Sequence, residues 1–73
     1  STCDLNYWDS VTLAEAHFLS NNIERACTMY QTAFHKFSNL TDCIKSTKLQ
    51  LERLASCMQL NSNNREIINK TLK

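Results

Sequence analysis

The chain has 73 residues and contains neither glycine nor proline. Without glycine it cannot form a phosphate-cradling loop or the sharp nucleophile elbow of many hydrolases. Long apolar runs are also missing, since no stretch approaches the roughly 20 apolar residues of a membrane-spanning helix. These absences exclude the common nucleotide-binding and hydrolase motifs and predict no membrane span in this chain.

The chain also has no large excess of positive or of negative charge. Eight Lys or Arg residues face seven Asp or Glu residues, for a net charge of +1, and the basic residues are interleaved with acids. The chain therefore lacks the positive electrostatic field that favours binding to nucleic acid. The two histidines, His17 and His35, fall on separate predicted helices, and no paired cysteines show metal-ligand spacing. We therefore expect no catalytic residues, no cofactor, no metal ion and no nucleic-acid partner.

What the sequence does contain is helical periodicity, punctuated by polar clusters. The second segment is the clearest, because its apolar residues recur at three- and four-residue steps: Ile23, Ala26, Cys27, Tyr30, Ala33, Phe34 and Phe37. The first segment shows capping-box spacing at Thr12 and Glu15 after Asp9-Ser10. We predict one all-α domain over residues 1–73, a small three- to four-helix up-down bundle with helices at roughly 10–20, 22–38, 42–60 and 64–72.

Four cysteines allow three disulfide pairings, and helix geometry ranks them. Cys43 and Cys57 lie on one predicted helix about 21 Å apart, too far for a bond that needs Cα atoms within about 7 Å. In a hairpin of the second and third helices, Cys27 lies close to Cys57 and far from Cys43. The predicted pairing is Cys3–Cys43 with Cys27–Cys57, two bridges that would stabilise a core this small.

Disulfides predict an extracellular, secreted protein. The alternatives are reduced, buried cysteines in a cytoplasmic protein, or a metal site. Because the chain begins at Ser1, we expect a processed mature protein or an excised fragment. Two Asn-x-Thr sequons make Asn39 and Asn69 candidate glycosylation sites.

Two candidate binding surfaces emerge from exposed apolar residues. Tyr7 and Trp8 precede the predicted first helix, where they either close the end of the bundle or form an aromatic anchor. Leu49 and Leu60 lie off the apolar stripe of the third helix, beside Arg53. These five residues are the candidate interface.

Residues 6–60 resemble a tetratricopeptide-type helical hairpin, through Leu13 and Ala14 and then Ala26, Tyr30 and Ala33. Within that class, Asn6-Tyr7-Trp8-Asp9, Ser46-Thr47 and Gln50-Leu51 are similar to the TRAF-binding helical region of apoptosis signal-regulating kinases. This resemblance implies an intracellular scaffold.

In architecture the chain also resembles the ectodomains of receptor activity-modifying proteins. Leu40 and Asp42-Cys43, which follows Cys27 by sixteen residues, are similar to the middle segment of that family. The resemblance implies an extracellular three-helix bundle with first–third and second–fourth cysteine pairing.

The sequence therefore predicts a small, secreted, disulfide-stabilised helical protein that acts by binding another protein, such as a receptor or other cell-surface protein. It would be a signalling ligand, a toxin-like effector or a receptor-associated ectodomain. The alternative is an intracellular tetratricopeptide-like adaptor fragment with reduced cysteines.

Overall fold

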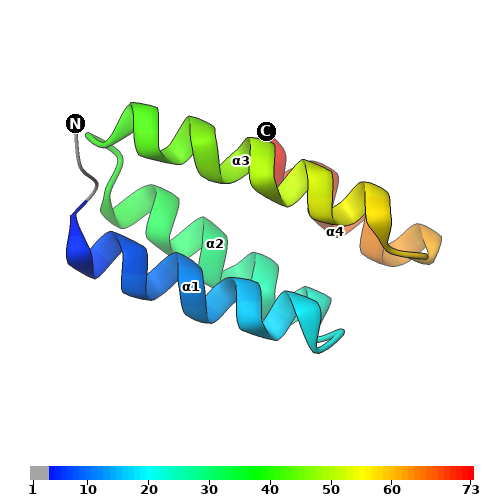
Figure 1. The fold of residues 1–73 in the computed structure, drawn as a ribbon. Helices are drawn as coiled ribbons and strands as arrows, with labels where there is room; N and C mark the ends of the chain where they lie inside the picture. Colours follow the sequence, from blue (N-terminus) through cyan, green and yellow to red (C-terminus); the bar gives the residue numbers. More distant parts are fainter. Residues whose placement is uncertain (1–3) are drawn as a thin grey trace.

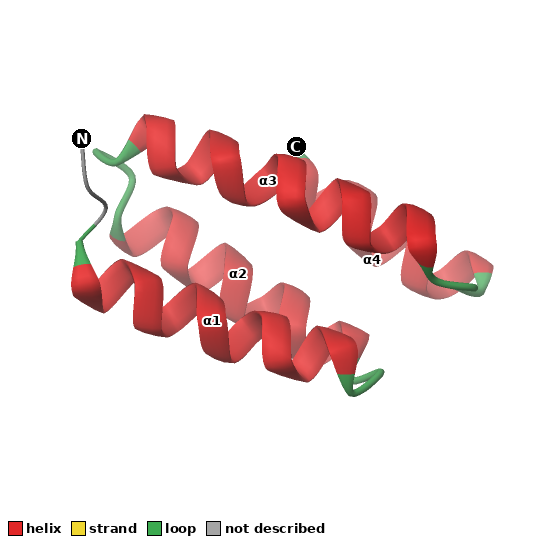
Figure 2. Cartoon of the chain, in the orientation of Figure 1, coloured by secondary structure: helices red, strands yellow, loops and turns green. Residues whose placement is uncertain are grey.

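The computed structural model describes residues 4–73, and these form four α-helices and no strand. The helices are α1 (Leu5–Leu19), α2 (Ile23–Lys36), α3 (Thr41–Cys57) and α4 (Ser62–Leu72). Consecutive helices run in opposite directions (Figure 1), and short turns join them (Figure 2). The predicted all-α fold is confirmed. None of these helices is both long and apolar enough to cross a membrane.

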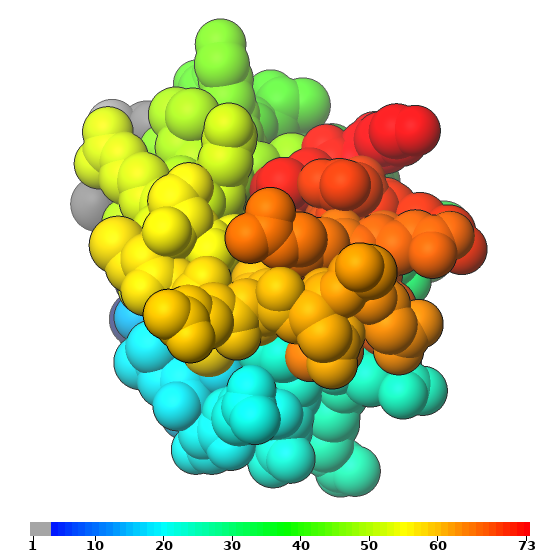
Figure 3. Space-filling view, turned by 90° about the vertical axis from the view of Figure 1, so that its right-hand side faces the viewer, coloured from blue at the N-terminus to red at the C-terminus, as the bar shows by residue number. Residues whose placement is uncertain are grey.

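The two halves of the chain form two layers. The hairpin of α1 and α2 makes one layer, and the hairpin of α3 and α4 covers it (Figure 1). Within this arrangement α4 packs along α2 and also contacts α3. Figure 3 looks at the end of the molecule where the α1–α2 turn and the connection between α3 and α4 lie, one above the other. The order of the helices around the core decides which faces stay exposed.

The first helix begins earlier than the predicted start at residue 10. Asp4 is the N-cap, and its carboxylate oxygen accepts a hydrogen bond of 2.7 Å from the backbone N–H of Asn6. Ser10 is inside the helix, where its hydroxyl donates to the carbonyl of Asn6 at 3.0 Å. The predicted capping box at Thr12 and Glu15 is therefore wrong, because the helix already begins at Leu5 and Asp4 caps a free amide of its first turn.

The turn after α1 shows how a chain without glycine closes a tight helix end. Asn21 has φ of 68°, in the left-handed region. Its N–H donates to the carbonyl of Phe18 at 3.1 Å, and the N–H of Asn22 donates to that of His17 at 2.9 Å. This is a Schellman motif, in which asparagine replaces the usual glycine because its short polar side chain tolerates this conformation.

The later helices differ from the predicted ranges at their ends: α2 is shorter at both ends, and α4 begins at Ser62 rather than at residue 64. The third helix ends at Cys57 rather than near residue 60. Asn61 then caps α4, since its side-chain oxygen accepts a hydrogen bond of 2.8 Å from the N–H of Asn64. The polar run at residues 61–64 begins with this cap, and its other three residues form the start of α4.

The core is built mainly from the first hairpin. Eleven buried apolar residues form one cluster, nine of them from α1 and α2: Tyr7, Val11, Ala14, Phe18, Ile23, Ala26, Cys27, Tyr30, Ala33, Leu51 and Ile68. The rings of Tyr7 and Phe37 meet edge to face, with centroids 5.6 Å apart. Leu51 is the only fully buried residue of α3, whereas Ile44, Leu54 and Met58 are partly exposed. The second layer thus contributes fewer buried residues to the core than the first layer does.

The cysteines correct one part of the prediction. Cys27 and Cys57 are both free, Cys27 buried and Cys57 exposed, so the predicted Cys27–Cys57 disulfide is wrong. The prediction packed the third helix directly along the second. Instead α4 lies on α2, and the thiol of Cys27 shares a hydrogen bond with Thr71 of α4.

The other predicted bridge joins Cys43 to Cys3. Cys43 is disulfide-bonded, and Cys3 lies outside the described residues. The Cys3–Cys43 pairing therefore stays a prediction. A domain with two free cysteines cannot hold two bridges among its four cysteines.

Candidate functional site

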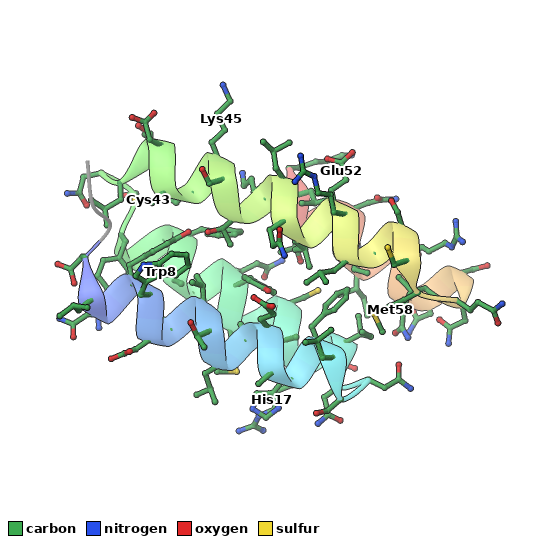
Figure 4. All side chains as sticks on the ribbon, in the orientation of Figure 1. Trp8, His17, Cys43, Lys45, Glu52 and Met58 are labelled. Atoms are coloured by element: carbon green, nitrogen blue, oxygen red, sulfur yellow. The ribbon has the colours of Figure 1, made fainter. Side chains whose placement is uncertain are left out.

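Two of the candidate interface residues, Tyr7 and Trp8, are neighbours in sequence but differ in exposure. Tyr7 is fully buried, and Trp8 is 53% exposed. They lie in the first turn of α1, where successive side chains point about 100° apart. Figure 4 shows Trp8 on the side of α1 nearest α3, below Cys43. Tyr7 is thereby removed from the candidate interface, and Trp8 remains in it.

Tyr7 instead joins the two layers. Its hydroxyl donates to the backbone carbonyl of Cys43 at 3.2 Å and shares a hydrogen bond with the hydroxyl of Thr47. Thr47 also donates to the Cys43 carbonyl at 2.9 Å. Burial raises the pKa of Tyr7, and the hydrogen bond with Thr47 offsets part of that rise. The residue closes the end of the bundle, which was one of the two interpretations of the sequence.

The other predicted interface residues do not form one surface. Leu49 is 52% exposed on the outer side of α3, and Arg53 is also exposed. Leu60 follows α3 and packs against the core. Lys45, one turn before Leu49, points away from the bundle (Figure 4). A single exposed leucine among charged side chains is ordinary for a protein surface, so this flank is a weak candidate.

The prediction missed a longer apolar surface on α1. Five of its residues, four apolar and one threonine, recur at three- and four-residue steps outside its buried side, with Trp8 on the margin nearest α3: Leu5, Trp8, Thr12, Ala16 and Leu19. They span an arc of about 80° and a length of about 21 Å. Leu5 is 78% exposed and Leu19 58%. We call these five residues the α1 outer stripe.

No other described helix presents a comparable face. The described residues include five exposed large hydrophobic residues, and α1 carries four of them, the fourth being Leu13. The exposed side of α2 is polar instead, with Glu24, Arg25, Thr28 and Thr32. A helix that is apolar on both sides is usually covered on both sides. The α1 outer stripe is therefore the surface of this domain that most resembles an uncovered contact.

The sequence held a signal for this surface. Leu5, Trp8 and Thr12 continue the helical spacing before and through the predicted start at residue 10. The stripe becomes visible only when the helix begins at Leu5, which requires recognition of Asp4 as the cap. The misplaced helix start is the reason that it was missed.

The two carboxylate side chains that α1 places beside the stripe are both acidic, and α1 carries no Lys or Arg. Asp9 flanks it on one margin and Glu15 on the margin toward α3, about 120° apart around the helix. Residues 1–24 contain four acidic residues and no Lys or Arg, whereas residues 25–73 contain three acidic residues and eight basic ones. The near-neutral net charge of the chain therefore conceals an acidic first helix.

A hollow of about 400 Å³ lies beside the stripe, between α1 and α3. Trp8 and Glu15 line it from α1, and Ser46 and Gln50 line it from α3. A second hollow of about 380 Å³ lies in the surface between α3 and α4. Its lining mixes polar and apolar side chains, and Arg65 at its edge donates to the carbonyl of Leu60 at 3.3 Å. Only the first hollow adjoins the exposed apolar surface.

Chemically reactive groups do not converge at either hollow. Burial raises the pKa of the Cys27 thiol and that of the Tyr30 hydroxyl, so both side chains stay protonated within the core. Among residues 4–73, no group of three His, Cys, Asp or Glu side chains is placed to hold a metal ion. Asn39 and Asn69 are exposed, which leaves both sequons accessible, and their glycosylation stays a prediction.

Comparison with protein-family models, curated proteins and solved structures finds no match. The resemblances to tetratricopeptide-type hairpins and to receptor activity-modifying proteins therefore stay predictions. The surfaces of the domain are the basis for assigning a function.

Proposed function

We propose that this domain is a protein-binding module that docks its partner on the α1 outer stripe. The observation that carries the proposal is the exposure of Leu5, Trp8 and Leu19 along one side of a helix whose other side is buried. Apolar surface in contact with water is unfavourable. A partner that covers it contributes about 25 cal/mol of binding free energy for each Å² of apolar area removed from water. Binding rather than catalysis is the activity that such a surface supports.

The predicted secreted ligand and the alternative intracellular adaptor both act by binding, and they differ in compartment. The secreted hypothesis rested on two disulfides, and the free thiols of Cys27 and Cys57 remove one of them. Protein binding is therefore proposed without a compartment. It applies equally to a receptor-associated ectodomain and to an adaptor fragment.

The proposal is tested by selection from a displayed library of helical peptides, which works without an identified partner. Peptides enriched on the wild-type domain are then measured against two double variants. Leu5→Ser/Leu19→Ser removes both ends of the stripe and leaves Trp8 in place. Leu13→Ser/Leu49→Ser makes the same chemical change at two exposed leucines outside the stripe and serves as the matched control.

We expect the selected peptides to bind the wild-type domain and the control variant equally, and the stripe variant at least tenfold more weakly. All four leucines are exposed, so both variants should keep the helical circular dichroism and the unfolding midpoint close to wild type. Equal binding to all three proteins, or selection of no binder at all, would overturn the proposal.

A further inference from the structure

We infer that the α1 outer stripe takes a basic amphipathic α-helix of about four turns, with Lys or Arg on both sides of its apolar row. This inference rests on the proposed function and names the chemistry of the partner. The juxtaposition that carries it is an exposed apolar row on α1 with Asp9 on one margin and Glu15 on the other.

The shape of the surface favours a helix. The stripe is a straight row about 21 Å long, not a closed pocket, and its side chains repeat at three- and four-residue steps. A second helix with the same steps can set its apolar side chains between them. The hollow of about 400 Å³ beside Trp8 gives such a helix room between α1 and α3, so that a long side chain can enter next to Trp8.

The charges favour a basic partner. Asp4, Asp9 and Glu15 are the charged side chains of α1 and its cap, because residues 1–24 contain no Lys or Arg. A helix lying on the stripe places its flanking residues beside Asp9 and Glu15. Lys or Arg there forms ion pairs, whereas Asp or Glu meets like charge.

The same charges argue against two other occupants. A second copy that docked its own stripe on this one would bring its Asp9 and Glu15 against the same two acids, with no Lys or Arg on either helix. An anionic membrane would repel the acidic flanks, since amphipathic helices that bind such membranes carry Lys and Arg beside their apolar face. A basic helix satisfies both the apolar row and its margins.

Trp8 provides a direct probe, because it is the only tryptophan in the chain and lies in the stripe with 53% of its surface exposed. Three tryptophan-free peptides of eighteen residues would share one apolar row and differ only in their flanks, which carry Lys, Gln or Glu. Binding is measured from the blue shift of Trp8 emission and from its protection against acrylamide quenching, at low and at physiological salt.

We expect the Lys peptide to bind, to shift and protect Trp8, and to lose affinity as salt rises. The Gln peptide should bind about fivefold more weakly and the Glu peptide more weakly still, because two margin ion pairs contribute modestly each. Asp9→Asn/Glu15→Gln should lower affinity for the Lys peptide to that for the Gln peptide. Glu52→Gln, the same kind of change on α3 outside the stripe, should leave it unchanged.

The remaining outcomes separate this inference from the proposed function. Equal binding of all three peptides would overturn the basic partner and leave the stripe as a docking surface. Lys-peptide binding that survives Leu5→Ser/Leu19→Ser would place the contact elsewhere and overturn the inference. So would sedimentation of the domain as a dimer that the same variant dissociates, since a second copy would then be the occupant. Failure of these peptides together with failure of the library selection would overturn both.

Discussion

The hydroxyl of Tyr7 donates a hydrogen bond to the backbone carbonyl of Cys43 at 3.2 Å, across 36 residues of sequence. This bond links the first turn of α1 to the first turn of α3, and Thr47 adds a second partner for the same hydroxyl. The side chain of Tyr7 is therefore buried in the bundle, whereas Trp8, the next residue, lies half-exposed at the margin of α1 nearest α3. The burial of Tyr7 thus leaves the neighbouring side of α1, the proposed docking surface, exposed.

Removal of the Tyr7 hydroxyl should destabilise the domain. We expect Tyr7→Phe to lower the free energy of unfolding by about 1–2 kcal/mol, because it breaks a buried hydrogen bond network and leaves the ring in place. Thr47→Val should have a similar effect, and the two changes together should cost less than their sum. Urea unfolding measures all three variants. Thr32→Val, at an exposed threonine, is the control, and strict additivity of the two core changes would contradict the shared network.

The positive φ of Asn21 predicts opposite effects for two substitutions there. Asn21→Ala should lower the free energy of unfolding by about 1 kcal/mol, since a side chain with a Cβ and no local hydrogen bond is strained in the left-handed region. Asn21→Gly should be neutral or slightly stabilising, because glycine is free of that strain but has more conformational entropy in the unfolded chain. Thermal unfolding provides the comparison.

Asn22 is the matched control for these substitutions, since its φ is −90°. At that ordinary conformation Asn22→Gly gains nothing from relief of strain and should destabilise the domain. If glycine has the same effect at both positions, the left-handed turn is not a special requirement of Asn21.

The two free cysteines should differ in reactivity. Cys57 is exposed and Cys27 is buried, and burial raises the pKa of the Cys27 thiol. In the folded domain a thiol reagent should modify Cys57 quickly and Cys27 only at the rate of unfolding. Mass spectrometry of the labelled peptides distinguishes the two sites, and Cys57→Ser should abolish the fast reaction.

The same measurement tests the remaining predicted bridge. Alkylation of the unfolded, unreduced protein should label Cys27 and Cys57, and reduction should raise the intact mass by about 2 Da, one disulfide's worth of hydrogen, and expose Cys3 and Cys43. Four labelled cysteines before reduction would remove the Cys3–Cys43 bridge. A Cys27–Cys57 peptide pair would contradict the structure.

Alkaline pH should destabilise the domain, because its buried thiol and phenol groups resist ionisation. The pKa values of Cys27, Tyr7 and Tyr30 are all raised by burial, with the charges of Glu15, Cys27 and Tyr7 adding to the effect at Tyr30. A raised pKa in the folded state means that the unfolded state binds fewer protons at high pH. Stability is therefore complete below the ordinary pKa values, 9.0 for the thiol and 10.0 for the phenols, and falls as pH rises through them.

Each of these groups lowers the free energy of unfolding by up to about 1.4 kcal/mol per pH unit, as long as it is ionised in the unfolded chain and protonated in the folded state. Urea unfolding from pH 7 to 11 should show a plateau followed by this decline. Tyrosinate absorbance should appear together with loss of helix, and Tyr30→Phe should make the decline less steep. Tyrosinate formation in a domain that keeps its full helical signal would contradict the burial of both tyrosines.

The sequence by itself determined the helices and much of the core. Three- and four-residue spacing predicted the buried side of α2, and Ile23, Ala26, Cys27, Tyr30 and Ala33 are all buried there. This works because the spacing of apolar residues along a helix is a local property, so the position of each residue in the repeat predicts which side of the helix it occupies. The start of α1 was less accessible, because Asp4 and Asp9 are both plausible caps from composition alone, and only packing distinguishes them.

Only the tertiary structure decided which helices are neighbours. The pairing of Cys27 with Cys57 assumed that α3 lies along α2, and the placement of α4 against α2 put Thr71 opposite Cys27 instead. The same packing decided that Tyr7 is covered by α3 and that Leu5, Trp8 and Leu19 are not covered. Local periodicity says that a helix has an apolar side, but the order of helices around the core determines whether another helix covers it. For this chain that order leaves the α1 outer stripe open.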